Sequence, residues 1–145
     1  MKTPKLLLEI ICGLFILLWL YAAVTKIASL ESFHKGLSHF PFIKNFAWLM
    51  AIGVPLSELL ATILLLRPQT RKMGLVLSVW LMSIFTLYIL YTMIFESKKP
   101  CSCGGILQQL GWEEHLVLNI ICIGLGVIGI KLYNRIKYNF NYNKI

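Results

Sequence analysis

Two cysteines one residue apart, Cys101 and Cys103, are the residues of this chain best suited to chemistry. They lie in the stretch KKPCSCGG, residues 98–105, between two long apolar runs. Thiolates attack disulfides and bind metal ions, and neighbouring cations such as Lys98 and Lys99 favour the thiolate form. We expect the pair to serve either thiol–disulfide exchange or metal binding.

A disulfide between Cys101 and Cys103 would close a very small ring. Cα atoms two residues apart in an extended chain are about 7 Å apart, whereas disulfides favour roughly 5.5–6 Å. The chain must therefore bend, and Gly104 and Gly105 allow this because glycine tolerates positive φ. Labile disulfides are typically catalytic or regulatory, and so short a ring constrains little chain entropy. The pattern favours exchange over a structural crosslink.

The rest of the chain has the composition of a membrane protein. Of its 145 residues, 58% are hydrophobic and 14% charged, whereas soluble domains are about 25% charged. Four apolar runs approach the roughly 20 residues that a membrane-spanning helix needs, and continuous runs of this kind are helices. We predict one all-α integral membrane domain over residues 1–145, a four-helix transmembrane bundle. The predicted spans are about 6–26, 46–66, 73–95 and 113–132.

The charges predict the orientation. With four spans, both termini and the 67–72 loop share one side, which holds nine of the 14 Lys and Arg residues. Positive charge prefers the cytoplasm, so both termini are expected there, and the loops 27–45 and 96–112 face outward. A signal peptide is the alternative reading of the first run, although that run exceeds the usual apolar stretch of about 7–15 residues.

This orientation places the cysteine pair in the periplasm of a bacterial inner membrane, where disulfides persist. The net charge of +8 is distributed at the ends of the apolar runs. We therefore expect contact with membrane lipid and no nucleic acid partner.

Metal binding remains an alternative use of the cysteine pair. Two thiolates and a histidine form sites for Cu(I) or Zn(II). All three histidines, His34, His39 and His115, are predicted on the outer side. The alternative metal set is therefore Cys101 and Cys103 with His115 and His39.

The remaining cysteines lie inside predicted spans, Cys12 in the first and Cys122 in the fourth. Buried cysteine usually behaves as a small hydrophobic residue. We expect that role for both, and no disulfide between them.

Glu58 is a charged residue inside the second predicted span, which by default indicates function. Pro55 removes a helix hydrogen bond one turn earlier. We expect a protonated Glu58 to hydrogen-bond Ser78 or Ser83 on the third span. The alternative is a proton site, or a polar group beside a quinone-like ligand.

Residues near the span ends are expected at the membrane interface. Trp48, Trp112, Tyr88 and Tyr91 fit the aromatic belts found at that depth. The tail from residue 133 to 145 is rich in Asn, Tyr and Lys, and we expect it to be interfacial or loosely ordered.

Several segments resemble the MauE/DoxX-like redox-associated membrane proteins, over about residues 6–132. They are AAVTKI followed by SLESFHKGL, then VPLSELLATILLL, and CSCGG followed by LGWEEHLVLN. The resemblance implies a DoxX-like four-helix bundle with Cys101 and Cys103 in the family's Cys-x-Cys and Glu58 at its acidic position. MauE is implicated in maturing a periplasmic, disulfide-rich subunit of methylamine dehydrogenase with a thioredoxin-like partner, and DoxX-type relatives are linked to sulfur-compound oxidation and quinone.

These observations together predict a membrane thiol–disulfide redox protein. Cys101 and Cys103 would exchange electrons with a periplasmic thioredoxin-like or disulfide-containing protein, and a quinone near Glu58 is the candidate cofactor. A second alternative, besides the metal site, is a non-catalytic subunit of a membrane complex. The GLGVIG run at 124–129 keeps that alternative open because small residues allow close helix packing.

Overall fold

The computed structural model describes residues 3–39, 43–95 and 112–142, and every regular element in these ranges is helical. The elements are α1 (Thr3–Ala28), α2 (Leu30–Ser38), the 3₁₀ turn η1 (Lys44–Phe46), α3 (Ala47–Leu66), α4 (Arg71–Phe95) and α5 (Trp112–Tyr142). Four segments are long and apolar enough to cross a membrane: α1, η1 with α3, α4, and most of α5. The predicted four-helix transmembrane bundle is confirmed.

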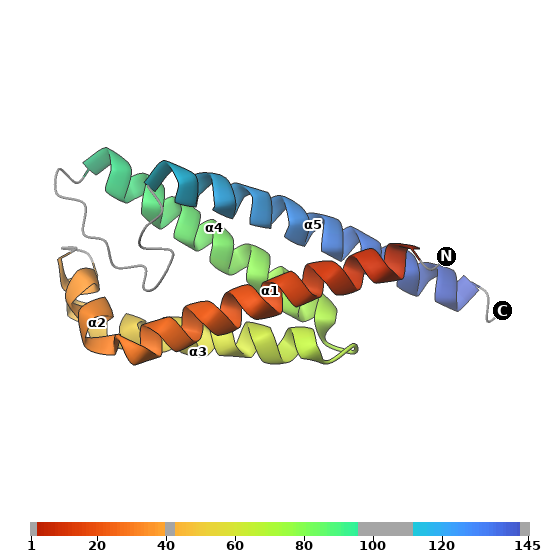
Figure 1. Ribbon diagram of the computed structural model, residues 1–145, viewed down its shortest axis with the longest axis horizontal. Coiled ribbons are helices and arrows are strands. Elements are labelled where there is room, and N and C mark those ends of the chain that lie inside the picture. The colour runs from red at the N-terminus through yellow and green to blue at the C-terminus, as the bar shows by residue number, and fades with distance from the viewer. Residues whose placement is uncertain (1–2, 40–42, 96–111, 143–145) are drawn as a thin grey trace.

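The four long helices form two antiparallel pairs, α1 with α3 and α4 with α5 (Figure 1). A short turn at residues 67–70 joins α3 to α4, and α1 meets α5 near the end of the bundle that carries both chain termini. At the opposite end the two pairs diverge, and the short helix α2 packs beside α3 there. This divergence leaves room for a cavity at one end of the bundle.

The core lies where the helices converge, and Trp19 is its largest fully buried side chain. Its Nε1 donates a hydrogen bond to Ser78 Oγ at 2.8 Å, and Ser78 Oγ donates in turn to the Gly74 carbonyl at 2.8 Å. A buried indole N–H needs such a partner. These hydrogen bonds connect α1 to the first half of α4 and fix the apolar core in the part of the bundle where the helices converge.

Close approach of α3 and α4 depends on Gly74. A Cβ added there would lie 2.8 Å from Leu65 Cγ and 2.9 Å from the Leu65 backbone nitrogen. Because backbone cannot yield as a flexible side chain does, we expect Gly74→Ala to destabilise the protein by about 1–3 kcal/mol. Thermal unfolding in detergent micelles, followed by circular dichroism, measures the change.

The matched control is Gly53→Ala in α3, where an added Cβ would meet no described heavy atom within 4 Å. Alanine is a better helix former than glycine by up to about 1 kcal/mol, so this variant should be neutral or more stable. Equal losses of thermal stability in the two variants would contradict the packing role of Gly74.

Two elements differ from the sequence prediction. The predicted outer loop at 27–45 contains the helix α2, with Leu37 buried and Phe33 half-buried against the bundle. The tail, predicted to be interfacial or loosely ordered, is helical as far as Tyr142. No proline or glycine follows Gly129 to interrupt the helix, so the backbone keeps its hydrogen bonds after the apolar run ends.

Candidate functional site: a cavity with a buried ion pair

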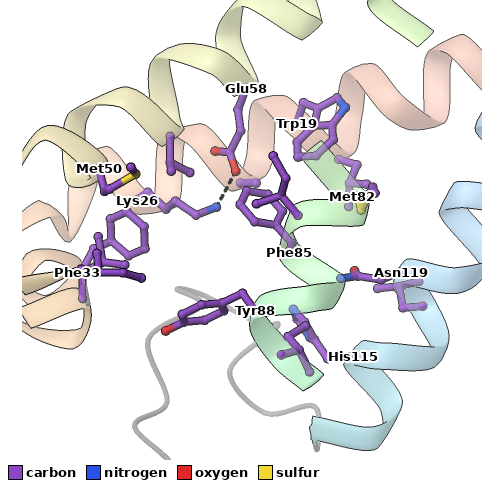
Figure 2. A pocket seen from close by; sticks show the side chains of 18 residues that line it. Trp19, Lys26, Phe33, Met50, Glu58, Met82, Phe85, Tyr88, His115 and Asn119 are labelled. Atoms are coloured by element: carbon purple, nitrogen blue, oxygen red, sulfur yellow. Dashed lines mark hydrogen bonds and ion pairs between the residues drawn. The ribbon is translucent and has the colours of Figure 1, made fainter. Parts of the chain in front are cut away.

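The diverging helices surround a partly open cavity of about 190 Å³ (Figure 2). Its walls come from all five α-helices and are largely apolar. Its polar or aromatic lining residues include Trp19, Lys26, Phe33, Glu58, Phe85, Tyr88, His115 and Asn119. An apolar chamber with a few convergent polar groups is the usual form of a small-molecule site.

Lys26 and Glu58 form a buried ion pair at this cavity. Lys26 Nζ lies 2.7 Å from Glu58 Oε1, and the exposed fractions of the two side chains are 11% and 0%. Lys26 belongs to the last turn of α1, and Glu58 is near the middle of α3. Burying a charge in this environment is tolerable because each ion compensates the other.

Two aromatic rings surround the ammonium group of Lys26. Its Nζ lies 5.9 Å from the centroid of the Phe33 ring on α2 and 5.7 Å from that of Phe85 on α4. A cation within about 6 Å of a ring face is attracted by its quadrupole. These contacts stabilise the lysine inside the bundle, so it does not extend toward water.

The predicted hydrogen bond from Glu58 to Ser78 or Ser83 is wrong. Ser78 is paired with Trp19, and Ser83 Oγ donates to the Val79 carbonyl on its own helix. The physical reason is the helix pairing: α1 packs along α3 and brings a lysine within reach of the carboxylate. A charged partner is a stronger hydrogen-bond donor than a serine hydroxyl.

The second carboxylate oxygen of Glu58, Oε2, accepts no hydrogen bond from the described residues. This oxygen is also buried. Figure 2 shows the carboxylate pointing from α3 toward Lys26 and Phe85, in the space that the lining residues surround. A buried acceptor without a donor costs about 1–3 kcal/mol, so this oxygen is a natural attachment point for a bound molecule.

The predicted cysteine pair, Cys101 and Cys103, lies outside the described residues. The segment that contains it connects the end of α4 at Phe95 to the start of α5 at Trp112. Both helix ends contribute to the cavity wall, through residues such as Tyr88 and Ile89 on α4 and His115 and Asn119 on α5. The cysteine segment is thus covalently attached to two walls of the cavity.

The two histidines of the alternative metal set, His115 and His39, differ in burial and in position. His115 is half-buried and lines the cavity, whereas His39 follows the last residue of α2 and is exposed. His34 stacks on Trp48, with ring centroids 4.1 Å apart. Within ranges 3–39, 43–95 and 112–142, no three His, Cys, Asp or Glu side chains are grouped to hold a metal ion.

Of the two cysteines inside the helices, Cys12 is buried as predicted, whereas Cys122 is half-buried. Both Cys12 and Cys122 are free thiols. Cys12 is buried in the core, and Cys122 packs against it. Tyr88, expected in an interfacial belt, instead lines the cavity, because α4 turns this residue toward the gap between the helix pairs.

Lys26 is the residue of this site that the sequence reasoning missed. It is the last residue of the first predicted span, about 6–26, and entered the prediction only as one of the positive charges outside the nine on the cytoplasmic side. The available signal was Glu58 itself, because an acidic group inside a span almost always has a partner. The identity of that partner depends on which helices pack together.

Fold and site together define a class of protein: a four-helix integral membrane protein whose diverging helix ends surround a cavity with a buried Lys–Glu pair. The family follows from comparison with known proteins. Residues 4–132 match the family described as methylamine utilisation protein MauE, and the chain belongs to that family. Searches of the curated proteins and of the solved structures found no match.

Proposed function

We propose that this MauE-family membrane protein exchanges electrons between Cys101 and Cys103 and a periplasmic partner that carries a reactive cysteine pair. The observation that supports it most is the attachment of the cysteine segment to the helix ends that line the cavity. A two-electron thiol reaction at the membrane surface and a membrane-embedded site for a second reactant are thereby adjacent along the chain.

The exchange proceeds through a mixed disulfide. One thiolate of the pair attacks a sulfur of the partner's disulfide, which breaks that bond and releases one partner thiolate. The neighbouring cysteine then attacks the mixed disulfide, so that a Cys101–Cys103 disulfide forms and the partner leaves with two thiols. The reverse sequence oxidises the partner and leaves the pair reduced.

A quinone dissolved in the membrane is the proposed second reactant. Two thiols and one quinone yield one disulfide and one quinol, with two electrons and two protons transferred. The cavity is chemically suited to a quinone because its walls are largely apolar and because Lys26 and Glu58 offer polar contacts. In the same proposal the cysteine segment faces the periplasm of a bacterial inner membrane.

The orientation and the redox state are tested together in intact cells. A chain in which Cys12 and Cys122 are replaced by alanine leaves the pair as the only thiols. We expect a membrane-impermeant maleimide to label the pair only after mild reduction. Labelling that requires membrane permeabilisation would reverse the orientation, and labelling that requires a chelator would indicate a metal site.

A further inference from the structure

We propose that the cavity binds an uncharged aromatic ring through a hydroxyl group that contacts both members of the Lys26–Glu58 pair. The hydroxyl donates its proton to Glu58 Oε2, and its oxygen accepts a hydrogen bond from Lys26 Nζ. The binding itself depends on described residues alone. Its redox role rests on the proposed function, in which a quinol would be such a ligand.

The size of the cavity and its apolar walls determine the size and polarity of the ligand that fits. An apolar cavity of roughly 150 Å³ accommodates benzene, so about 190 Å³ admits a single substituted ring. Phe33, Phe85, Met50 and Met82 line the space, and aromatic and thioether side chains pack well against rings. A charged ligand is disfavoured because Lys26 and Glu58 already neutralise each other at 2.7 Å.

The hydrogen-bonding capacity of Glu58 and Lys26 determines which polar group the ligand must carry. Glu58 Oε1 is occupied by Lys26, whereas Oε2 is a buried acceptor with no donor in the described part of the chain. Lys26 has three N–H donors, of which one reaches Glu58. A hydroxyl pairs with Oε2 and with a second N–H of Lys26 together, whereas a carbonyl or an ether oxygen leaves Oε2 without a donor from the ligand.

The carboxylate has the freedom to make this contact. Rotation about the terminal torsion of a glutamate is soft and broadly distributed, so a small rotation turns Oε2 toward the cavity and keeps Oε1 near Lys26. Hydrogen bonds to an ionised carboxylate are shorter and stronger than those between neutral groups. The site should therefore distinguish a hydroxyl-bearing ring from the same ring without the hydroxyl proton.

The test is a comparison of two redox-inert probes, 4-fluorophenol and 4-fluoroanisole, which differ by methylation of the hydroxyl. Binding to the full chain in lipid nanodiscs is followed by ¹⁹F NMR, with empty nanodiscs as the correction for lipid partitioning. We expect the phenol to bind at least tenfold more tightly than the ether. Equal affinities, or no saturable binding of either probe, would overturn the proposal.

Variants test whether the preference for the phenol arises at Glu58 in this cavity. Glu58→Gln presents an amide donor where Oε2 was, and we expect it to abolish the preference for the phenol. Ala22→Leu fills the cavity from α1 without altering either charge, and should weaken both probes. The matched control is Glu31→Gln, which removes an exposed ion pair with Lys35 of similar length, 2.9 Å, and should change nothing. A phenol preference that survives Glu58→Gln, or probe affinities that Ala22→Leu leaves unchanged, would place the binding elsewhere.

The result is separable from the proposed thiol exchange. The same phenol preference is expected when Cys101 and Cys103 are both replaced by serine, because neither thiol takes part in the binding. Loss of exchange with intact phenol binding would remove only the redox role of the ligand. Intact exchange without phenol binding would reject the cavity proposal and leave the proposed function standing.

Discussion

Replacing Cys101 or Cys103 by serine is expected to abolish thiol–disulfide exchange, because a single thiol has no neighbour to resolve a mixed disulfide. The assay first reduces the purified protein in nanodiscs, removes the reductant, and then adds a thioredoxin-fold protein that carries an oxidised Cys-x-x-Cys pair. Exchange is measured by acid quenching and thiol labelling. Of the two single variants, the one that retains the attacking cysteine should accumulate a covalent complex with the partner.

The control for this experiment is Cys122→Ala, which removes a free thiol that packs against the core. It should exchange at the rate of the unmodified chain. If the Cys101→Ser/Cys103→Ser double variant also keeps that rate, the pair is not the redox centre, and the scaffold role considered from the sequence becomes the better explanation.

Loss of Lys26 is expected to have the largest effect on stability. Lys26→Met leaves the carboxylate of Glu58 buried without its cation, and breaking a buried ion pair costs roughly 3–5 kcal/mol. Glu58→Leu should cost less, because Lys26 lies at the end of α1 and its side chain is already 11% exposed, so that it can extend toward the interface. Thermal unfolding in micelles measures both changes.

The double variant Lys26→Met/Glu58→Leu decides whether the charges act as a pair. Apolar replacement of both partners is often neutral or stabilising, so the double variant should recover most of the stability lost in Lys26→Met. The exposed pair of Glu31 and Lys35 on α2 is the control, and its removal should leave the unfolding temperature unchanged. Additive losses in the double variant would show that the pair is not coupled.

Most of the fold could be predicted from the sequence because the apolar runs are long and continuous. The third span was expected at 73–95 and lies in α4 at Arg71–Phe95. The end of α5 was missed because hydropathy reports where hydrocarbon ends, whereas a helix ends where its backbone hydrogen bonds stop. For α2 a signal existed: Leu30, Phe33 and Leu37 recur at helical spacing.

The site was less predictable, for a physical reason. Glu58 could be identified because a charge inside an apolar run is rare, but its partner depends on helix pairing. Ser78 and Ser83 were the expected partners because they lie at a similar depth on the third span. In the structure Lys26 on α1 is the partner, and the cavity requires side chains from all five α-helices, a set that no local pattern brings together.

The pairing of α1 with α3 and of α4 with α5 has a consequence for biogenesis. Each pair is formed by neighbouring transmembrane segments, so the bundle consists of two helical hairpins that join across the turn at 67–70. Locally connected contacts form quickly, and membrane helices associate after each has been inserted. The first hairpin can therefore bring Lys26 and Glu58 together while the ribosome is still translating the second hairpin. Neither charged residue then remains unpaired in the lipid.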